Sequence, residues 1–143
     1  GPILVTKELL KGMIKTKEGS IIFIGSAVAH YGGVGKSFYS ASKSALYGFV
    51  KSISKELGRA NIRVNSISPG YIKTKLTENL SDAELDKTIK SISLRRGGNA
   101  DEVSSLINFL LSENSKYITG EDIKIDGGIV LWLNLTTFSR ILI

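Results

Sequence analysis

The alternation of short apolar runs with long amphipathic segments constrains the fold of this chain more than any other feature. Residues 21–24 form a short, continuous run rich in β-branched side chains, which is typical of a strand buried on both faces of a parallel sheet. Apolar residues at 62–67 and at 123–125 predict two further strands. Because helical segments stand between these strands, the pattern predicts an α/β fold with right-handed parallel crossovers.

Four segments carry helix signals. Residues 3–15 and 38–57 place their apolar side chains on one helix face. Ser81, followed three residues later by Glu84, is a capping-box signature for a short helix, and Asn99 is suited to cap another. Three strands with these helices amount to half of an open, doubly wound sheet.

The chain is long enough for one domain, which we expect to span residues 1–128. It has 143 residues, of which 42% are hydrophobic and 22% charged, the ordinary balance of a globular protein. Residues 129–143 form an apolar C-terminal extension with little charge. This extension suits packing over a sheet edge or a partner subunit, and an aberrant, aggregation-prone end is the alternative interpretation.

Composition argues against several classes of function. The chain has no Cys and one His, which disfavours disulfides and zinc sites. The net charge is +6, but the basic residues are spread along the chain, so we expect no nucleic-acid partner. No apolar run is long enough to span a bilayer and no secretory leader is recognisable, so the sequence predicts no membrane association and a cytoplasmic location.

Two side chains with complementary chemistry open the predicted helix 38–57. Tyr39 and Lys43 are four residues apart, which places a phenol and an ammonium on one helix face. A nearby positive charge favours the phenolate form, so such a Tyr can donate a proton to a carbonyl oxygen or take one from an alcohol. Ser26 follows the strand 21–24, at the edge where open α/β sheets bind ligands. A solvated helix face and a turn-capping Ser are the alternative interpretations.

Four ordered motifs are similar to those of the short-chain dehydrogenase/reductases, and among these the chain resembles the 3-oxoacyl-(acyl-carrier-protein) reductase type. The motifs are Gly25-Ser26, the Tyr39/Lys43 pair with Ser44-Ala45-Leu46, the stretch 62–70 ending in Ser68-Pro69-Gly70, and the stretch 117–128 ending in Asp126-Gly127-Gly128. The resemblance covers about residues 3–130 and implies the C-terminal half of a doubly wound, Rossmann-type sheet. The Gly-rich pyrophosphate turn of the family has no counterpart, so we expect the N-terminal dinucleotide-binding half to be missing.

The resemblance implies hydride transfer between a nicotinamide and a small carbonyl or alcohol substrate, with NAD or NADP as cofactor and NADP slightly favoured. It makes Tyr39 the general acid/base, Ser26 the group that orients the substrate oxygen, and Lys43 the partner of Tyr39 and of the nicotinamide ribose. Cofactor contacts are expected from Tyr39, Lys43, Pro69, Gly70, Ile72 and Thr74. Substrate contacts are expected from Ser26, His30, Tyr31 and Tyr71, and a core position is the alternative interpretation of Tyr71. His30 is expected in a loop between Ser26 and Tyr39, where simple exposure is the more common explanation of a His.

The resemblance also implies a homo-oligomer, a dimer or tetramer built through helices 3–17 and 38–57, and a segment 75–95 that closes over substrate. A different interpretation is a truncated, inactive remnant that acts at most as an oligomerisation module. Sugar-nucleotide epimerases and dehydratases share the Tyr–Lys pair, but the Pro-Gly loop and the Asp-Gly-Gly ending favour the simple reductases.

Overall fold

The computed structural model describes residues 1–78 and 80–129. Its elements, in chain order, are α1 (Pro2–Thr16), β1 (Gly19–Ile24), α2 (Val28–Tyr31), α3 (Ser37–Leu57), η1 (Gly58–Ala60), β2 (Ile62–Pro69), η2 (Lys75–Thr77), α4 (Asp82–Lys90), α5 (Ala100–Leu111), η3 (Glu113–Ser115) and β3 (Asp122–Ile125). None of the described helices is both long and apolar enough to cross a membrane.

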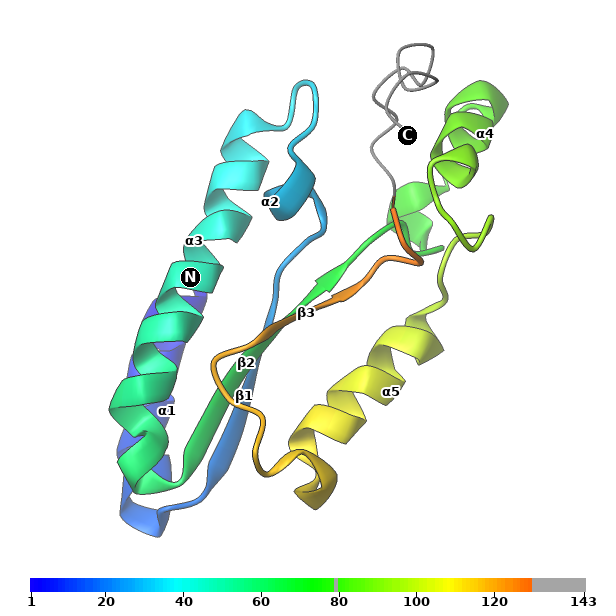
Figure 1. Ribbon diagram of the computed structural model, residues 1–143. Helices are drawn as coiled ribbons and strands as arrows, with labels where there is room; N and C mark the ends of the chain where they lie inside the picture. The colour runs from blue at the N-terminus through cyan, green and yellow to red at the C-terminus, as the bar shows by residue number, and fades with distance from the viewer. Residues whose placement is uncertain (79, 130–143) are drawn as a thin grey trace, which may run out of the picture.

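The three strands form one parallel sheet in the order β1-β2-β3, so β2 is the central strand. Ile21 of β1 pairs with Val64 of β2, and Ser66 of β2 pairs with Asp122 of β3. Helices α1 and α3 cover one face of the sheet and α5 covers the other (Figure 1). The chain therefore has the layered α/β arrangement that the alternating pattern predicts.

Strand β2 is buried along most of its length because both of its faces are covered. Successive side chains of a strand point to opposite faces. Ile62 and Val64 contribute to the core on the α1/α3 side. Farther along the same face the strand carries Ser66 and Ser68, which are fully buried polar residues. The core side of this strand thus changes from apolar to polar toward its C-terminal end.

The main hydrophobic core lies between the sheet and helices α1 and α3. Phe23 of β1 contacts Phe49 of α3 edge to face, with ring centroids 5.5 Å apart. The buried members of this core are Phe23, Leu46, Val50, Ile53, Leu57, Ile62 and Val64. The apolar stripe predicted on residues 38–57 is therefore the stripe that α3 turns toward the sheet.

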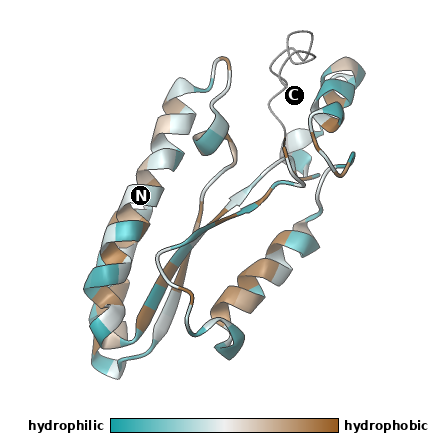
Figure 2. Ribbon diagram, in the orientation of Figure 1, coloured by the Kyte–Doolittle hydropathy of each residue, from teal (hydrophilic) through white to brown (hydrophobic). Residues whose placement is uncertain are grey.

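The opposite face is covered by α5, which is hydrophobic along most of its length (Figure 2). Leu110 near its end is fully buried. The guanidinium of Arg63 on β2 donates to the carbonyl oxygens of Leu110 at 2.7 Å and Ser112 at 3.4 Å. These bonds satisfy carbonyls at a helix end that have no partner within the helix.

The ends of α4 and α5 follow the capping chemistry of the sequence. At α4 the Ser81 hydroxyl accepts from the Glu84 amide, and the Glu84 carboxylate accepts from the Ser81 amide. The Ser81 hydroxyl also donates to the Glu84 carboxylate at 2.6 Å, and this bond, together with the one from the Ser81 amide, lowers the pKa of Glu84. At α5 the Glu102 carboxylate accepts from the Asn99 amide and forms two hydrogen bonds with Arg96.

The structure confirms the three predicted strands and the four predicted helices, and it corrects the segment between Ser26 and Tyr39. Residues predicted there as loop include the short helix α2, which contains His30. Four residues give no periodic signal, and the turn is held by contacts with α3 and β3 that the sequence pattern does not show. Of the predicted extension, residue 129 pairs with Ile92 and residues 130–143 lie outside the described part of the chain.

Candidate active site

The carboxyl ends of all three strands meet at one edge of the sheet, and Ser26 lies there. Hydrogen bonds continue the strand pairing beyond the end of β1: the Gly25 amide donates to the Ile67 carbonyl at 2.7 Å, and the Ala27 amide donates to the Pro69 carbonyl at 2.9 Å. These two bonds flank Ser26 and fix its backbone. Ser26 therefore occupies the position where open α/β sheets bind ligands.

Tyr39 and Lys43 reach the same edge from the first turns of α3. The Lys43 ammonium donates to the carbonyl of Ile24, the last residue of β1, at 2.8 Å. It also lies 5.9 Å from the centroid of the Tyr39 ring, at the outer limit of a cation–π contact. The structure thus places Tyr39 and Lys43 near each other on α3, as their spacing predicts, with Lys43 at the strand end that leads into Ser26.

The polar atoms of this pair remain available to a ligand. The Tyr39 side chain is 46% exposed, and within residues 1–78 and 80–129 nothing hydrogen-bonds its hydroxyl. An ammonium has three donors, and the bond to Ile24 uses one. A phenol and a cation with free hydrogen-bonding capacity suit a ligand that carries hydroxyls and a carbonyl oxygen.

Pro69 and Gly70 join this edge from the end of β2. The Gly70 amide donates to the Ile125 carbonyl of β3 at 3.0 Å. A Cβ on Gly70 would lie 2.7 Å from the Cα of Asp126, so the close approach of the two loops requires a Gly at this position. Pro69 and Gly70 thus hold the loops after β2 and β3 together beside Ser26.

Tyr71 and Ile72 belong to a second group of contacts, and Thr74 is the residue that precedes η2. The Lys73 amide donates to the Gly98 carbonyl and the Gly98 amide donates to the Tyr71 carbonyl, which ties this segment to the loop before α5. The Tyr71 ring packs over Gly97. Tyr71 and Ile72 line a small pocket with Arg96, Glu102, Asp126 and neighbouring residues, and none of Ser26, Tyr39 and Lys43 lines it.

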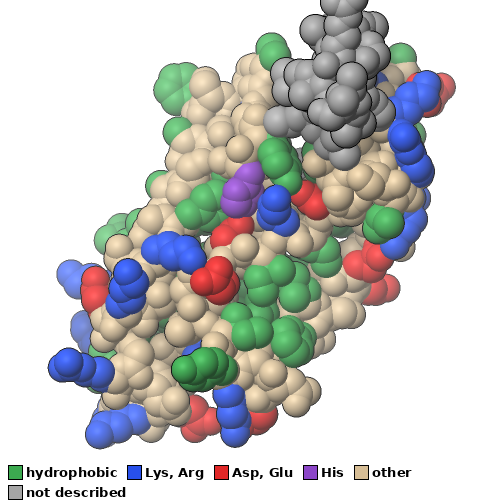
Figure 3. All heavy atoms as spheres, in the orientation of Figure 1, with side chains coloured by type: hydrophobic (Ala, Val, Ile, Leu, Met, Phe, Trp, Pro, Cys, Tyr) green, Lys and Arg blue, Asp and Glu red, His purple; other side chains and the backbone are tan. Residues whose placement is uncertain are grey.

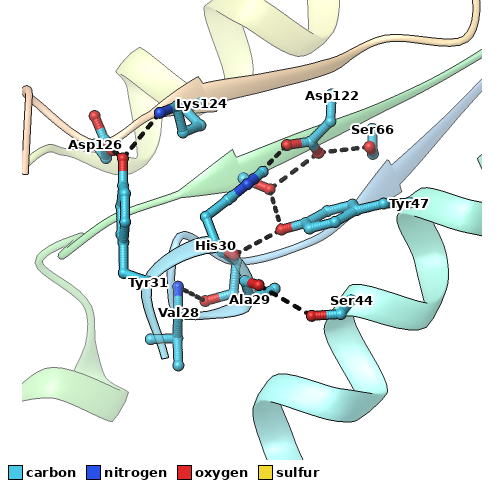
Figure 4. Close-up of polar contacts among 12 residues, drawn as sticks. Val28, Ala29, His30, Tyr31, Ser44, Tyr47, Ser66, Asp122, Lys124 and Asp126 are labelled. Carbon is cyan, nitrogen blue, oxygen red and sulfur yellow. Dashed lines mark hydrogen bonds and ion pairs between the residues drawn. The ribbon is translucent and has the colours of Figure 1, made fainter. Parts of the chain in front are cut away.

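His30 and Tyr31 are engaged with β3 through their side chains (Figure 4). His30 Nε2 lies 2.7 Å from Asp122 Oδ2, and the Tyr31 hydroxyl donates to Asp126 at 2.9 Å. Lys124 donates to the Tyr31 hydroxyl at 2.9 Å, and this bond raises the pKa of Lys124. Figure 3 shows the single His at the surface of this face, with acidic and basic side chains beside it. The substrate contacts expected of His30 and Tyr31 stay a prediction.

A polar cluster next to His30 is not predicted by the sequence pattern. The Asp122 carboxylate accepts from the hydroxyls of Ser66 at 2.5 Å and Ser68 at 3.0 Å, and Ser68 also hydrogen-bonds the Tyr47 hydroxyl at 2.9 Å. Burial, together with the charge of Asp122, raises the pKa of Tyr47. Two signals were available: serines alternate on the core face of a strand, and Tyr47 continues the four-residue spacing of Tyr39 and Lys43.

Comparisons with known proteins show which family the chain is similar to. Residues 1–130 match the model of the family described as enoyl-(acyl carrier protein) reductase. The chain is 44% identical over 127 residues to 3-oxoacyl-(acyl-carrier-protein) reductase FabG of Buchnera aphidicola subsp. Baizongia pistaciae, which covers 89% of this chain and 52% of the relative.

Two further relatives show the same extent of similarity. The chain is 47% identical over 133 residues to carbonyl reductase family member 4 of Xenopus laevis, covering 93% of this chain and 54% of the relative. It is 42% identical over 131 residues to FabG of Thermotoga maritima, covering 92% and 53%. The chain spans about half the length of the curated relatives it matches.

Proposed function

This chain belongs to the short-chain dehydrogenase/reductase family, is of the 3-oxoacyl-(acyl-carrier-protein) reductase type, and we propose that it carries the catalytic residues of an NAD(P)-dependent carbonyl reductase. One observation carries the proposal: the Tyr39 ring lies 5.9 Å from the Lys43 ammonium, which is anchored to the strand end that leads to Ser26, and no described residue hydrogen-bonds the Tyr39 hydroxyl. The names of the relatives support a carbonyl substrate, and we propose a 3-oxoacyl thioester as the first class to examine.

Each side chain has a role that its surroundings support. Tyr39 donates a proton to the substrate oxygen in reduction and takes it back in oxidation. The Ser26 hydroxyl hydrogen-bonds the same oxygen and so orients the carbonyl. The charge of Lys43 stabilises the phenolate that Tyr39 leaves behind, and its remaining donors suit hydroxyls of a ribose.

The residues present fit the nicotinamide end of NAD or NADP. When bound, the nicotinamide supplies the hydride that the carbonyl carbon receives. Tyr39 and Lys43 would hold the ribose, and the segment from Pro69 through Thr74 would contact the carboxamide. Pro69 and Gly70 lie beside Ser26, Ile72 belongs to the neighbouring group of contacts, and Thr74 precedes η2.

A homo-oligomer through α1 and α3 is a separate proposal, supported by the outer face of α1. Large apolar side chains on that helix are exposed to solvent: Ile3, Leu4, Val5, Leu9 and Ile14. Exposed apolar patches of this kind mark interfaces. Analytical ultracentrifugation should show a dimer or tetramer for the chain and a smaller species for Leu9→Glu; a monomeric wild-type chain would contradict the oligomer. A cytoplasmic location stays a prediction.

The enzymatic proposal is tested by following NADPH and NADH oxidation with an acetoacetyl thioester and with a small ketone. Tyr39→Phe should lower kcat by about 100-fold or more, because general acid–base catalysis contributes that much. Tyr117→Phe is the matched control, since Tyr117 is fully exposed and outside the site. Equal rates for Tyr39→Phe and the control would refute the assignment of Tyr39.

A further inference from the structure

Five polar contacts and the backbone between Ser26 and Ala27 form a closed ring beyond the end of β1. The Tyr47 hydroxyl lies 2.8 Å from the Ser26 carbonyl oxygen and 2.9 Å from Ser68 Oγ, and it shares its one proton between these two acceptors. Ser68 donates to Asp122, and Asp122 contacts His30 at 2.7 Å. The α2 backbone closes the ring, because the His30 amide donates to the carbonyl of Ala27, the residue after Ser26, at 3.0 Å. Figure 4 shows His30 between Asp122 and the Tyr47 ring.

Ring stacking and burial support these contacts. The His30 and Tyr47 rings are stacked with centroids 4.6 Å apart and an interplanar angle of 22°. The Asp122 side chain is 12% exposed, and it accepts from two fully buried serines as well as contacting His30. Removing one partner from such a contact leaves a nearly buried charge with one bond fewer, which is costly.

The segment inside this ring needs external support. Helix α2 has four residues, far fewer than an isolated helix needs, and glycines follow it. Its ties to α3 are the hydrogen bonds from the Ser40 hydroxyl to the Val28 carbonyl and from the Ser44 hydroxyl to the Ala29 carbonyl. On the β3 side, it is tied through the side chains of His30 and Tyr31.

Helix α2 is hydrogen-bonded directly to Ser26. The Val28 amide donates to the Ser26 hydroxyl at 3.3 Å, and the Ala29 amide donates to the Ser26 carbonyl at 2.9 Å. Both donors belong to α2, and the Val28 amide contacts the hydroxyl oxygen itself, so a displacement of Val28 would remove a bond that orients the Ser26 hydroxyl.

We propose that His30, Tyr47 and Asp122 are positioning residues that fix α2 against β3 and thereby set the direction of the Ser26 hydroxyl. The proposal rests on the proposed reductase function for the role of Ser26, but the contacts themselves can be tested without substrate. None of the three residues needs to touch substrate. Their effect on the reaction passes through Ser26.

The single His of the chain makes a clean spectroscopic test possible. A carboxylate can only accept, so the contact with Asp122 requires a proton on His30 Nε2. Long-range ¹H–¹⁵N spectra at about pH 8, above the ordinary imidazole pKa, should show the Nε2–H tautomer in the wild-type chain. Asp122→Asn places a donor opposite Nε2 and should shift His30 toward the Nδ1–H tautomer.

Amide hydrogen exchange tests whether the contact holds α2. In His30→Leu, the amides of Ala29, Tyr31 and Gly32 should exchange about tenfold faster or more, which corresponds to about 1.4 kcal/mol of local opening. In β1 and β2, the amides should keep their protection. His30→Gln retains a donor for Asp122 and should restore part of the protection. Lys51→Ala is the matched control, because it removes an exposed ion pair with Glu121, the neighbour of Asp122.

Unchanged exchange at α2 in His30→Leu, or the same tautomer in the wild-type chain and Asp122→Asn, would overturn the proposal. Faster exchange spread evenly over β1 and β2 would also overturn it, since that shows a general loss of stability. If the wild-type chain reduces no carbonyl, the proposed function fails while the tautomer and exchange results still decide the positioning role. If the wild-type chain does reduce a carbonyl substrate, His30→Leu should lower kcat about tenfold with the cofactor KM unchanged.

Discussion

Replacing Gly70 by Ala should separate the loops that follow β2 and β3. An ideal Cβ at this position lies 2.7 Å from both Cα and Cβ of Asp126, and 3.0 Å from Cδ1 of Ile129. Carbon atoms prefer about 3.5–4.0 Å, so the new methyl group is about 0.8–1.3 Å too close to Asp126. Because one of the opposing atoms is backbone, a side-chain rotation cannot relieve the contact.

The cost follows from this overlap and from one hydrogen bond. Overpacking of one methyl group costs about 1–3 kcal/mol, and separating the loops weakens the 3.0 Å bond from the Gly70 amide to the Ile125 carbonyl. We expect the free energy of unfolding to fall by about 2–4 kcal/mol. For a domain of this size that lowers Tm by about 8–16 °C.

Urea unfolding followed by far-ultraviolet circular dichroism measures the change. Gly48→Ala in the middle of α3 is the matched control, because nothing lies within 4 Å of its added Cβ and Ala favours a helix by about 1 kcal/mol. The two substitutions should therefore change stability in opposite directions. Wild-type stability in Gly70→Ala would refute the close approach of the two loops.

Two further predictions concern α5. The two hydrogen bonds from Arg96 and the one from the Asn99 amide lower the pKa of Glu102 from 4.5 to about 2, so the folded state has stability above pH 4.5 that it loses as pH falls through about 2. In acid titrations followed by circular dichroism, Glu102→Gln should therefore lose less unfolding free energy over that range than the wild-type chain. An equal loss would contradict the role of the carboxylate. Leu110→Ala should cost about 2–5 kcal/mol in urea unfolding because Leu110 is fully buried, and a cost below about 1 kcal/mol would mean that α5 does not pack on the sheet as described.

The elements that the sequence predicted well are those with a strong local signal. The run 21–24 and the alternating apolar positions of β2 need no distant partner to be recognised as strands, and the apolar stripe of α3 matches its buried face. The proximity of Tyr39 and Lys43 follows from helical spacing alone. Ser26 is predicted at the sheet edge because it directly follows a strand signal, and ligands in open α/β folds bind beyond the carboxyl ends of strands.

What the sequence did not show depends on contacts between distant segments. Helix α2 is too short for a periodic pattern, and side chains of α3 and β3 hold it. The cluster of Tyr47, Ser68 and Asp122 requires the strand register, since Asp122 is 54 residues from Ser68 and adjoins it only when β3 pairs with β2. Polar residues at core positions such as Ser68 were the one local indication.

The central claim, that Lys43 and Tyr39 form a nicotinamide site, is tested most directly by fluorescence titration of the 143-residue chain with NADPH and NADH. The wild-type chain and the control Lys55→Ala should bind saturably, and Lys43→Ala should bind at least about tenfold more weakly while keeping its circular dichroism spectrum. Equal binding by Lys43→Ala, or no binding by a well-folded wild-type chain, would contradict the claim.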